Sequence, residues 1–148
     1  MADPKVRNDI GLLLAITSQL FQSRLGALLS QHDLTYSQFA LLSHLRGAAK
    51  STAISDLAAA LEINQPGVTK VVQRLTEQGF VSAEVDPQDS RRRLISLTPT
   101  AGERTDEVTK TLAEDSAAWF GEWSDADLLG FRNRLADLAG WLDANRLA

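Results

Sequence analysis

The chain has 148 residues, of which 44% are hydrophobic and 23% are charged, a balance typical of one globular domain or one compact subunit. It has no cysteine, which excludes disulfides, thiolate metal sites and cysteine nucleophiles and favours a reducing compartment. The longest apolar stretches have roughly five residues, and the N-terminal MADPKVRND has no apolar core of the signal-peptide type behind it. The sequence therefore predicts a soluble cytoplasmic protein with no membrane span.

The net charge of −4 is distributed unevenly along the chain. Residues 99–148 carry a net −5, and the preceding 98 residues carry a net +1. The positive charges of the middle segment are concentrated at Lys70, Arg74 and Arg91–Arg93. Because the placement of charge decides contact with nucleic acid, the acidic total does not exclude DNA as a partner.

The N-terminal third is predicted to be helical. Apolar residues at helical spacing predict a first helix over residues 6–31, with a stripe wide enough to indicate burial on more than one side. In the stretch LTYSQF, Thr35 and Gln38 have capping-box spacing, which predicts the start of a second helix. That helix is predicted to end at Gly47.

Two further helices are predicted around the stretch EINQPG. A short one covers residues 53–61 and can be capped by Ser51 or Thr52. Asn64 is the expected N-cap of the next, which has Pro66 in its first turn and ends at a glycine stop.

The following segment predicts a hairpin. GFVSAEV alternates apolar and polar residues, and RLISLT places Ile95 and Leu97 on one face. The stretch DPQDSRR is predicted to be the loop that joins these two strands.

Two helices are predicted in the C-terminal third. Thr100 and Glu103 repeat the capping-box spacing at the start of a helix that runs toward Trp119. A last helix is predicted to start at Ser124, and its apolar residues recur at steps of three and four in a coiled-coil-like seam. The seam consists of Leu128, Phe131, Leu135, Leu138 and Leu142.

This order of elements is that of a winged helix-turn-helix, a mainly α fold with a small β-hairpin wing (α+β). The connection before the third helix is short, as helix-turn-helix geometry requires. The third helix also divides cleanly into an inner and an outer face. Its inner stripe consists of Val68, Val71, Val72 and Leu75.

The outer face of that helix has the chemistry of DNA recognition. Gln can pair with adenine, Thr can contact a base edge, a phosphate or the thymine methyl group, and Lys and Arg can contact guanine or phosphate. The free N–H groups at the helix start favour phosphate, and a glycine there permits close approach. A polar outer face is usually only solvated, but its place on this helix favours DNA contact. The candidate DNA-binding residues are Asn64, Gln65, Pro66, Gly67, Thr69, Lys70, Gln73 and Arg74.

The candidate wing contacts are three consecutive arginines at the predicted hairpin tip. Side by side they repel one another unless a polyanion meets them, and a narrow minor groove attracts arginine. Arg91 is the preferred residue for the minor groove, with Asp89 holding it through a charge-assisted hydrogen bond. Arg92 and Arg93 are expected to contact phosphate or to stay in water, although the sequence does not decide which of the three arginines enters the groove.

These residues resemble the MarR family of bacterial transcriptional regulators, and the resemblance covers nearly the whole chain. The wing pattern D-P-x-D-x-R followed by LT is the most specific part, matched here by Asp86, Asp89, Arg91, Leu97 and Thr98. The chain departs from many members in the first wing strand, where SAE replaces a basic residue. A buttressing ion pair of the wing is therefore expected to be absent.

The resemblance implies a cytoplasmic homodimer that binds palindromic operator DNA, usually as a repressor, and often responds to a small aromatic or phenolic effector. It divides the single subunit, residues 1–148, into a DNA-binding lobe at residues 33–99 and a helical dimerisation lobe at residues 5–32 and 100–148. The heptad-like spacing alone leaves an intramolecular core as the alternative. The expected dimerisation residues are Leu13, Leu14, Leu128, Phe131, Leu135, Leu138 and Leu142.

Two other classes of function are alternatives to this interpretation. An enzyme is disfavoured because there is no thiol, no glycine-rich phosphate loop and no His-x-x-x-His pair, only the separated His32 and His44. No catalytic residue, metal ligand or cofactor is therefore predicted. A winged-helix module that binds protein instead of DNA is the remaining alternative, disfavoured by the retained basic residues.

Trp119, Phe120 and Trp123 can line an effector pocket, but aromatic residues near a helix break are more often core, so no pocket is assigned. The sequence leaves open the operator, the regulated genes, the effector and the sign of regulation.

Overall fold

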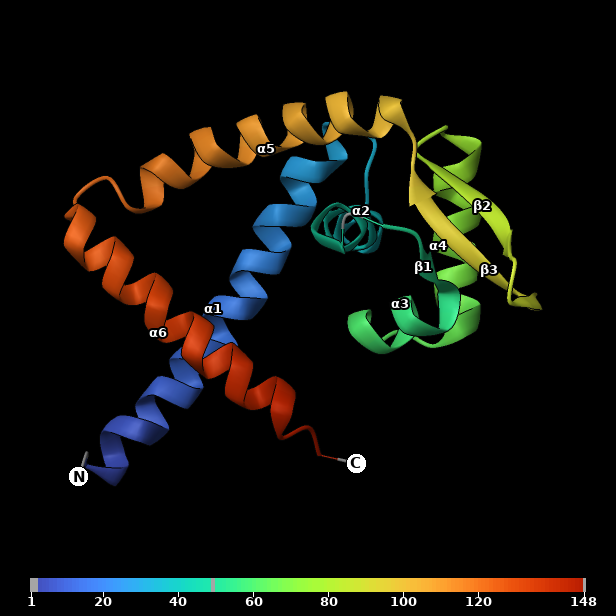
Figure 1. Ribbon diagram of the computed structural model, residues 1–148. Helices are drawn as coiled ribbons and strands as arrows, with labels where there is room; N and C mark the ends of the chain where they lie inside the picture. Colours follow the sequence, from blue (N-terminus) through green and yellow to red (C-terminus); the bar gives the residue numbers. More distant parts are fainter. Residues whose placement is uncertain (1–2, 49, 148) are drawn as a thin grey trace. The chain divides into compact units, whose positions relative to one another are not determined.

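A computed structural model describes residues 3–48 and 50–147. The chain divides into two compact units, Met1–Leu112 and Ala113–Ala148. The predicted mainly helical fold with a small sheet is confirmed (Figure 1). In chain order the elements are α1 (Pro4–Ser30), α2 (Tyr36–Ala48), β1 (Thr52–Ala53), α3 (Ile54–Leu61), α4 (Gln65–Glu77), β2 (Val81–Asp86), β3 (Asp89–Leu97), α5 (Pro99–Trp119) and α6 (Asp125–Ala144).

The sheet has three antiparallel strands in the order β1-β3-β2. The predicted hairpin is present, with Val81 opposite Leu97, but the sequence missed β1, which pairs Ala53 with Leu94. A strand of two residues is too short to show an alternating pattern. Its presence also makes the predicted cap of α3 wrong, because Thr52 belongs to the strand and the N-cap is Ala53, which has no capping side chain.

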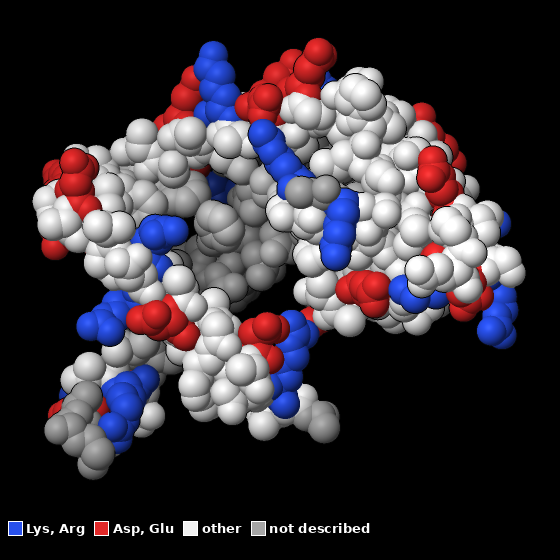
Figure 2. All heavy atoms as spheres, in the orientation of Figure 1, with Lys and Arg blue, Asp and Glu red and all other residues white. Residues whose placement is uncertain are grey.

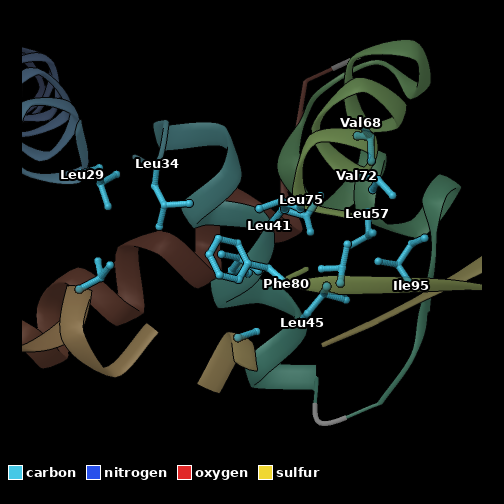
Figure 3. Packing of buried hydrophobic residues seen from close by; sticks show 14 of the residues in the cluster. Leu29, Leu34, Leu41, Leu45, Leu57, Val68, Val72, Leu75, Phe80 and Ile95 are labelled. Atoms are coloured by element: carbon cyan, nitrogen blue, oxygen red, sulfur yellow. The ribbon is translucent and has the colours of Figure 1, made fainter. Parts of the chain in front are cut away.

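The core of the first unit gathers apolar side chains from helices and sheet around one centre (Figure 3). Burial of such a cluster is the main source of stability for a lobe of this size. Fully buried members include Leu41 on α2, Leu57 on α3, Val68 and Leu75 on α4, and Ile95 on β3.

The turn between α1 and α2 has the predicted capping box. The Thr35 backbone N–H donates to Gln38 Oε1 at 2.8 Å, and the Gln38 N–H donates to Thr35 Oγ1 at 3.2 Å. Gln38 is only 5% exposed, and its Nε2 donates to Gln78 Oε1 at 3.1 Å. Gln38, the second residue of the capping box, therefore also connects this turn to the C-terminal end of α4.

Two predicted helix boundaries are wrong. Helix α2 continues through Gly47 to Ala48, because Arg46 in its last turn bonds to Thr105 and Asp106 of α5 and holds that turn in place. Helix α5 starts at Pro99, so Thr100 lies inside the helix and is not its cap. Proline is favoured at a first helical position, where its missing N–H costs nothing.

Much of α1 and most of α6 are exposed. Only Leu25 and Leu29 of α1 are buried, whereas Leu20 is 66% exposed, so the wide stripe is not covered within the first unit. No residue of α6 is buried, although Ser124 caps it as predicted. By length and composition alone α1 is long and apolar enough to cross a membrane, a test that core helices of soluble proteins also pass, so the expectation of no membrane span stays a prediction.

Candidate nucleic-acid interface

Helices α3 and α4 form the helix-turn-helix. Three residues separate them, and the first, Glu62, takes up a left-handed conformation with φ of 53° that turns the chain between the helices. Asn64 ends the turn as the N-cap of α4, and its Oδ1 accepts the Gly67 N–H at 2.8 Å, which confirms the predicted cap. The start of α4 is therefore fixed by its own side chain.

Gly67 is required by this cap. A Cβ at this position would lie 2.7 Å from Ile63 Cγ2 and 3.1 Å from Asn64 Oδ1. Packing inside the turn thus accounts for the glycine without DNA, while close approach of the backbone to a phosphate stays a prediction.

The two faces of α4 divide as predicted. Val68, Val72 and Leu75 are buried and point into the core of the first unit (Figure 3). Val71 is half-buried beside them. The outward residues Gln65, Thr69, Lys70, Gln73 and Arg74 are all exposed.

Internal hydrogen bonds use up some donors of the outer face. Thr69 Oγ1 donates to the Gln65 carbonyl at 2.9 Å, and Gln73 Nε2 donates to Glu77 Oε1 at 3.3 Å. Within the described part of the chain, Lys70 and Arg74 have no ion pair. The face therefore offers two uncompensated cations, a free glutamine at its N-terminal end and the methyl group of Thr69.

The three arginines lie within strand β3 and not in the hairpin loop, which corrects the prediction. The strands join through Pro87 and Gln88 only. Val85 pairs with Arg93 and Asp86 pairs with Asp89. The pairing of β2 with β3 is therefore irregular at this point, and residues 90–92 have no opposite residue in β2. Such bulges bend a strand and redirect its side chains.

Arg91 is the most exposed of the ion-paired arginines of the wing, with 92% of its side chain accessible. Its backbone N–H donates to Asp89 Oδ1 at 3.0 Å, and its Nε approaches the same oxygen at 3.5 Å. The contact expected between these two residues is present. Asp89 thus anchors the base of the side chain and leaves its guanidinium in solvent.

Arg92 makes contacts that the sequence did not indicate. Its guanidinium lies 3.3 Å from Asp56 of α3 and 3.9 Å from Asp86 of β2. Asp56 is 36 residues away in the chain, so no local signal could have found this pair. An ion pair therefore does brace the wing, through different residues from the basic position that this chain lacks. Arg93 is exposed and, among the described residues, has no ion pair.

Charge is mixed over the visible surface. Basic and acidic side chains are interspersed in the space-filling view, including the end of the first unit that carries β2 and β3 (Figure 2). A contact with DNA on this protein therefore depends on individual exposed cations and not on a broad basic surface.

Two features outside the interface bear on an effector. In the first unit, a cavity of about 280 Å³ between α2 and α5 is lined by Phe39, Ser43, Arg46, Gly47, Thr105 and Thr109. In the second unit, the rings of Trp119, Phe120, Trp123 and Phe131 form a chain of contacts with centroids 5.3–6.0 Å apart. Residues 3–48 and 50–147 contain no cluster of His, Asp or Glu suited to a metal ion.

A short turn, an outward polar helix and an arginine-bearing hairpin define a winged helix-turn-helix of the DNA-binding class. The MarR family model matches residues 32–92. The uncharacterized HTH-type transcriptional regulator YdcH of Bacillus subtilis is 31% identical over 113 residues, which are 74% of this chain and 77% of that protein. The chain belongs to the MarR family of transcriptional regulators, which are DNA-binding proteins and not enzymes.

Other relatives agree with this assignment. The multiple antibiotic resistance protein MarR of Escherichia coli is 32% identical over 89 residues, 60% of this chain and 61% of that protein. A MarR-family regulator from Rhodococcus has the same fold, with a TM-score of 0.79 at 20% identity over 93% of this chain and 96% of that one. A mutant of E. coli MarR in complex with operator DNA has a TM-score of 0.72 at 21% identity over 93% of this chain and 99% of that one.

The cap of α4 gives a direct test of the turn. Replacing Asn64 with Ala removes the acceptor of the Gly67 N–H and should lower the free energy of unfolding by about 1 kcal/mol. Chemical denaturation measures the change. Asn64→Asp is the matched control, since it keeps a capping oxygen and should retain most of the stability. Equal stability of the Ala variant would contradict the role of the cap.

Proposed function

We propose that the protein is a ligand-responsive repressor that binds palindromic operator DNA as a homodimer, with α4 in the major groove and Arg91 in the minor groove. The observation that carries this proposal is the exposed polar face of α4 in the same lobe as a wing arginine that is 92% exposed. Membership of the MarR family, in which the E. coli protein has been crystallised with operator DNA, supports it. A cytoplasmic location is part of the same proposal.

The recognition helix is proposed to divide its contacts between bases and backbone. Gln65 has an exposed amide that can pair with adenine, and the oxygen of Gln73 can accept from a base amino group. Since the Thr69 hydroxyl is already bonded to Gln65, its methyl group is the part left to contact thymine. Lys70 and Arg74 are proposed to hold phosphates, which positions the helix on the duplex.

Two subunits are proposed to associate through their exposed apolar helices. On α1, Leu13 is 60% exposed, and on α6, Phe131 and Leu142 are 41% and 50% exposed. Apolar surface of this extent usually marks an interface. A two-fold dimer would present two recognition helices to half-sites about one helical turn, ~34 Å, apart.

Binding to another protein through the winged helix is the alternative. Modules of that kind do not need cations on the recognition face. Lys70 and Arg74 are exposed here and, in the described part of the chain, have no ion pair, which favours a polyanion as the partner.

The wing contact can be tested with DNA from upstream of the protein's own gene. Arg91→Ala should weaken binding at least several-fold, about the loss of one charge-assisted contact in the groove. Fluorescence anisotropy at two salt concentrations measures it, and random DNA of equal length is the control. Unchanged binding by the variant would move the minor-groove contact to another arginine, and native protein that does not prefer this DNA to random DNA would favour the protein-binding alternative.

The dimer can be tested on α6. Leu135→Arg places a charge in the apolar seam and should convert the dimer to monomers at micromolar concentration, since an unpaired buried charge costs several kcal/mol. Sedimentation velocity measures the mass. The control is Asp137→Arg, which adds an arginine at a position 75% exposed on the same helix outside the seam. A dimer that survives Leu135→Arg would point to an interface elsewhere.

A small aromatic or phenolic effector is proposed to bias the spacing of the two recognition helices. The cavity between α2 and α5 supports this, because its size is near the lower end for small-molecule sites and Phe39 in its lining can contact an aromatic ring. An effector must bind one spacing more tightly than the other. Titration with a panel of benzoates and phenols should therefore change the affinity for DNA, and a panel with no active member would contradict this part of the proposal.

A further inference from the structure

The contacts of Arg92 join two parts of the lobe that are distant in sequence. On one side its Nη2 lies 3.3 Å from Asp56 Oδ2, in the first turn of α3. On the other side its Nε lies 3.9 Å from Asp86 Oδ2, at the end of β2. The same guanidinium therefore contacts the helix-turn-helix and the wing.

The two carboxylates are themselves held in place. The Asp86 side chain is only 12% exposed, and its Oδ1 accepts the Gln88 N–H at 2.9 Å, which fixes the hairpin turn. Asp56 is followed by Leu57, which is fully buried in the core. Both ends of the bridge are thus attached to ordered parts of the fold.

The bridge adds to a backbone connection at the same place. Strand β1 runs directly into α3 and pairs Ala53 with Leu94, two residues beyond Arg92. Helix α3 packs against α4 in the common core, and β2 and β3 also pack directly against α4 and α2. The position of the wing relative to the recognition helix is therefore set in part through α3, and Arg92 is the side chain that links α3 to both strands of the wing.

The charge balance distinguishes Arg92 from its neighbour. The Arg92 side chain is 45% exposed, about half the exposure of Arg91, and lies between two carboxylates, so its positive charge is compensated within the protein. Arg91 is almost fully exposed beside a single carboxylate. A compensated guanidinium has less to gain from a phosphate, because the contact would break ion pairs that already exist.

We propose that Arg92 is a positioning residue that fixes the wing to the helix-turn-helix through Asp56 and Asp86, and that it leaves the contact with DNA to Arg91. This inference rests on the proposed function, since the wing must meet DNA for its position to matter. It assigns Asp56, an acidic residue, a supporting role in binding a polyanion.

The sign of the effect at Asp56 makes the inference testable. Removing an acidic side chain near a DNA-binding surface ordinarily raises affinity, because repulsion of phosphate is lost. If Asp56 positions the wing through Arg92, Asp56→Asn should instead weaken binding about three- to fivefold, the upper part of the range expected for an exposed ion pair. The matched control is Glu84→Gln in β2, which removes an exposed carboxylate that has no ion pair in the described part of the chain, and which should bind equally or slightly tighter.

The experiment compares the native chain with Asp56→Asn, Arg92→Gln, the double variant and Arg92→Lys on DNA from upstream of its own gene, by anisotropy over a salt series. Each single neutralisation should weaken binding about three- to fivefold, the double variant should be no weaker than Arg92→Gln, and Arg92→Lys should recover most of the affinity. The slope of log affinity against log salt should not change, whereas loss of a phosphate contact would reduce it by about one. Thermal unfolding verifies that each variant is folded.

The two proposals fail in different ways. Native protein that binds this DNA no better than random DNA would contradict the proposed function. Specific binding by the native chain together with equal or tighter binding by Asp56→Asn, or a reduced salt slope for Arg92→Gln, would overturn the positioning role and make Arg92 a phosphate contact.

Discussion

The burial of the apolar stripe on α4 is the constraint on which the rest of the structure depends. Val68, Val72 and Leu75 pack into the same core as Leu57 of α3 and Ile95 of the sheet. This packing fixes the rotation of α4 about its own axis, so that the polar row opposite the stripe must face solvent. Which polar side chains face outward, and therefore which of them can contact bases, is decided by the burial of the apolar stripe.

The same core leaves many apolar side chains of α1 and α6 unburied. It covers only the last turns of α1, with Leu25 and Leu29, and α6 contributes no buried residue. Exposed leucine and aromatic side chains on both helices carry a cost in water that neither unit recovers by itself. A second copy covering these surfaces would link dimerisation to function, because only a dimer can set the distance between two recognition helices.

The contacts that a charged side chain of this protein can make depend on its position and not on the net charge. The molecule is acidic overall, and acidic and basic groups are interspersed on its visible face (Figure 2). Within the wing, neighbouring arginines differ in environment, with Arg91 in solvent and Arg92 between Asp56 and Asp86. Identical side chains one residue apart therefore have different surroundings, and the proposed contact with DNA and the proposed positioning role are divided between them accordingly.

The sequence by itself determined the features that depend on local chemistry. The capping box of Thr35, the Asn64 cap and the inner stripe of α4 could all be read from spacing, because helix ends and helix faces are decided within a few residues. Only the tertiary structure decided the extent of α2 past Gly47, the added strand β1 and the partner of Arg92. Each of these depends on groups far apart in the chain, and sequence spacing has no information about which distant residues will meet once the core has formed.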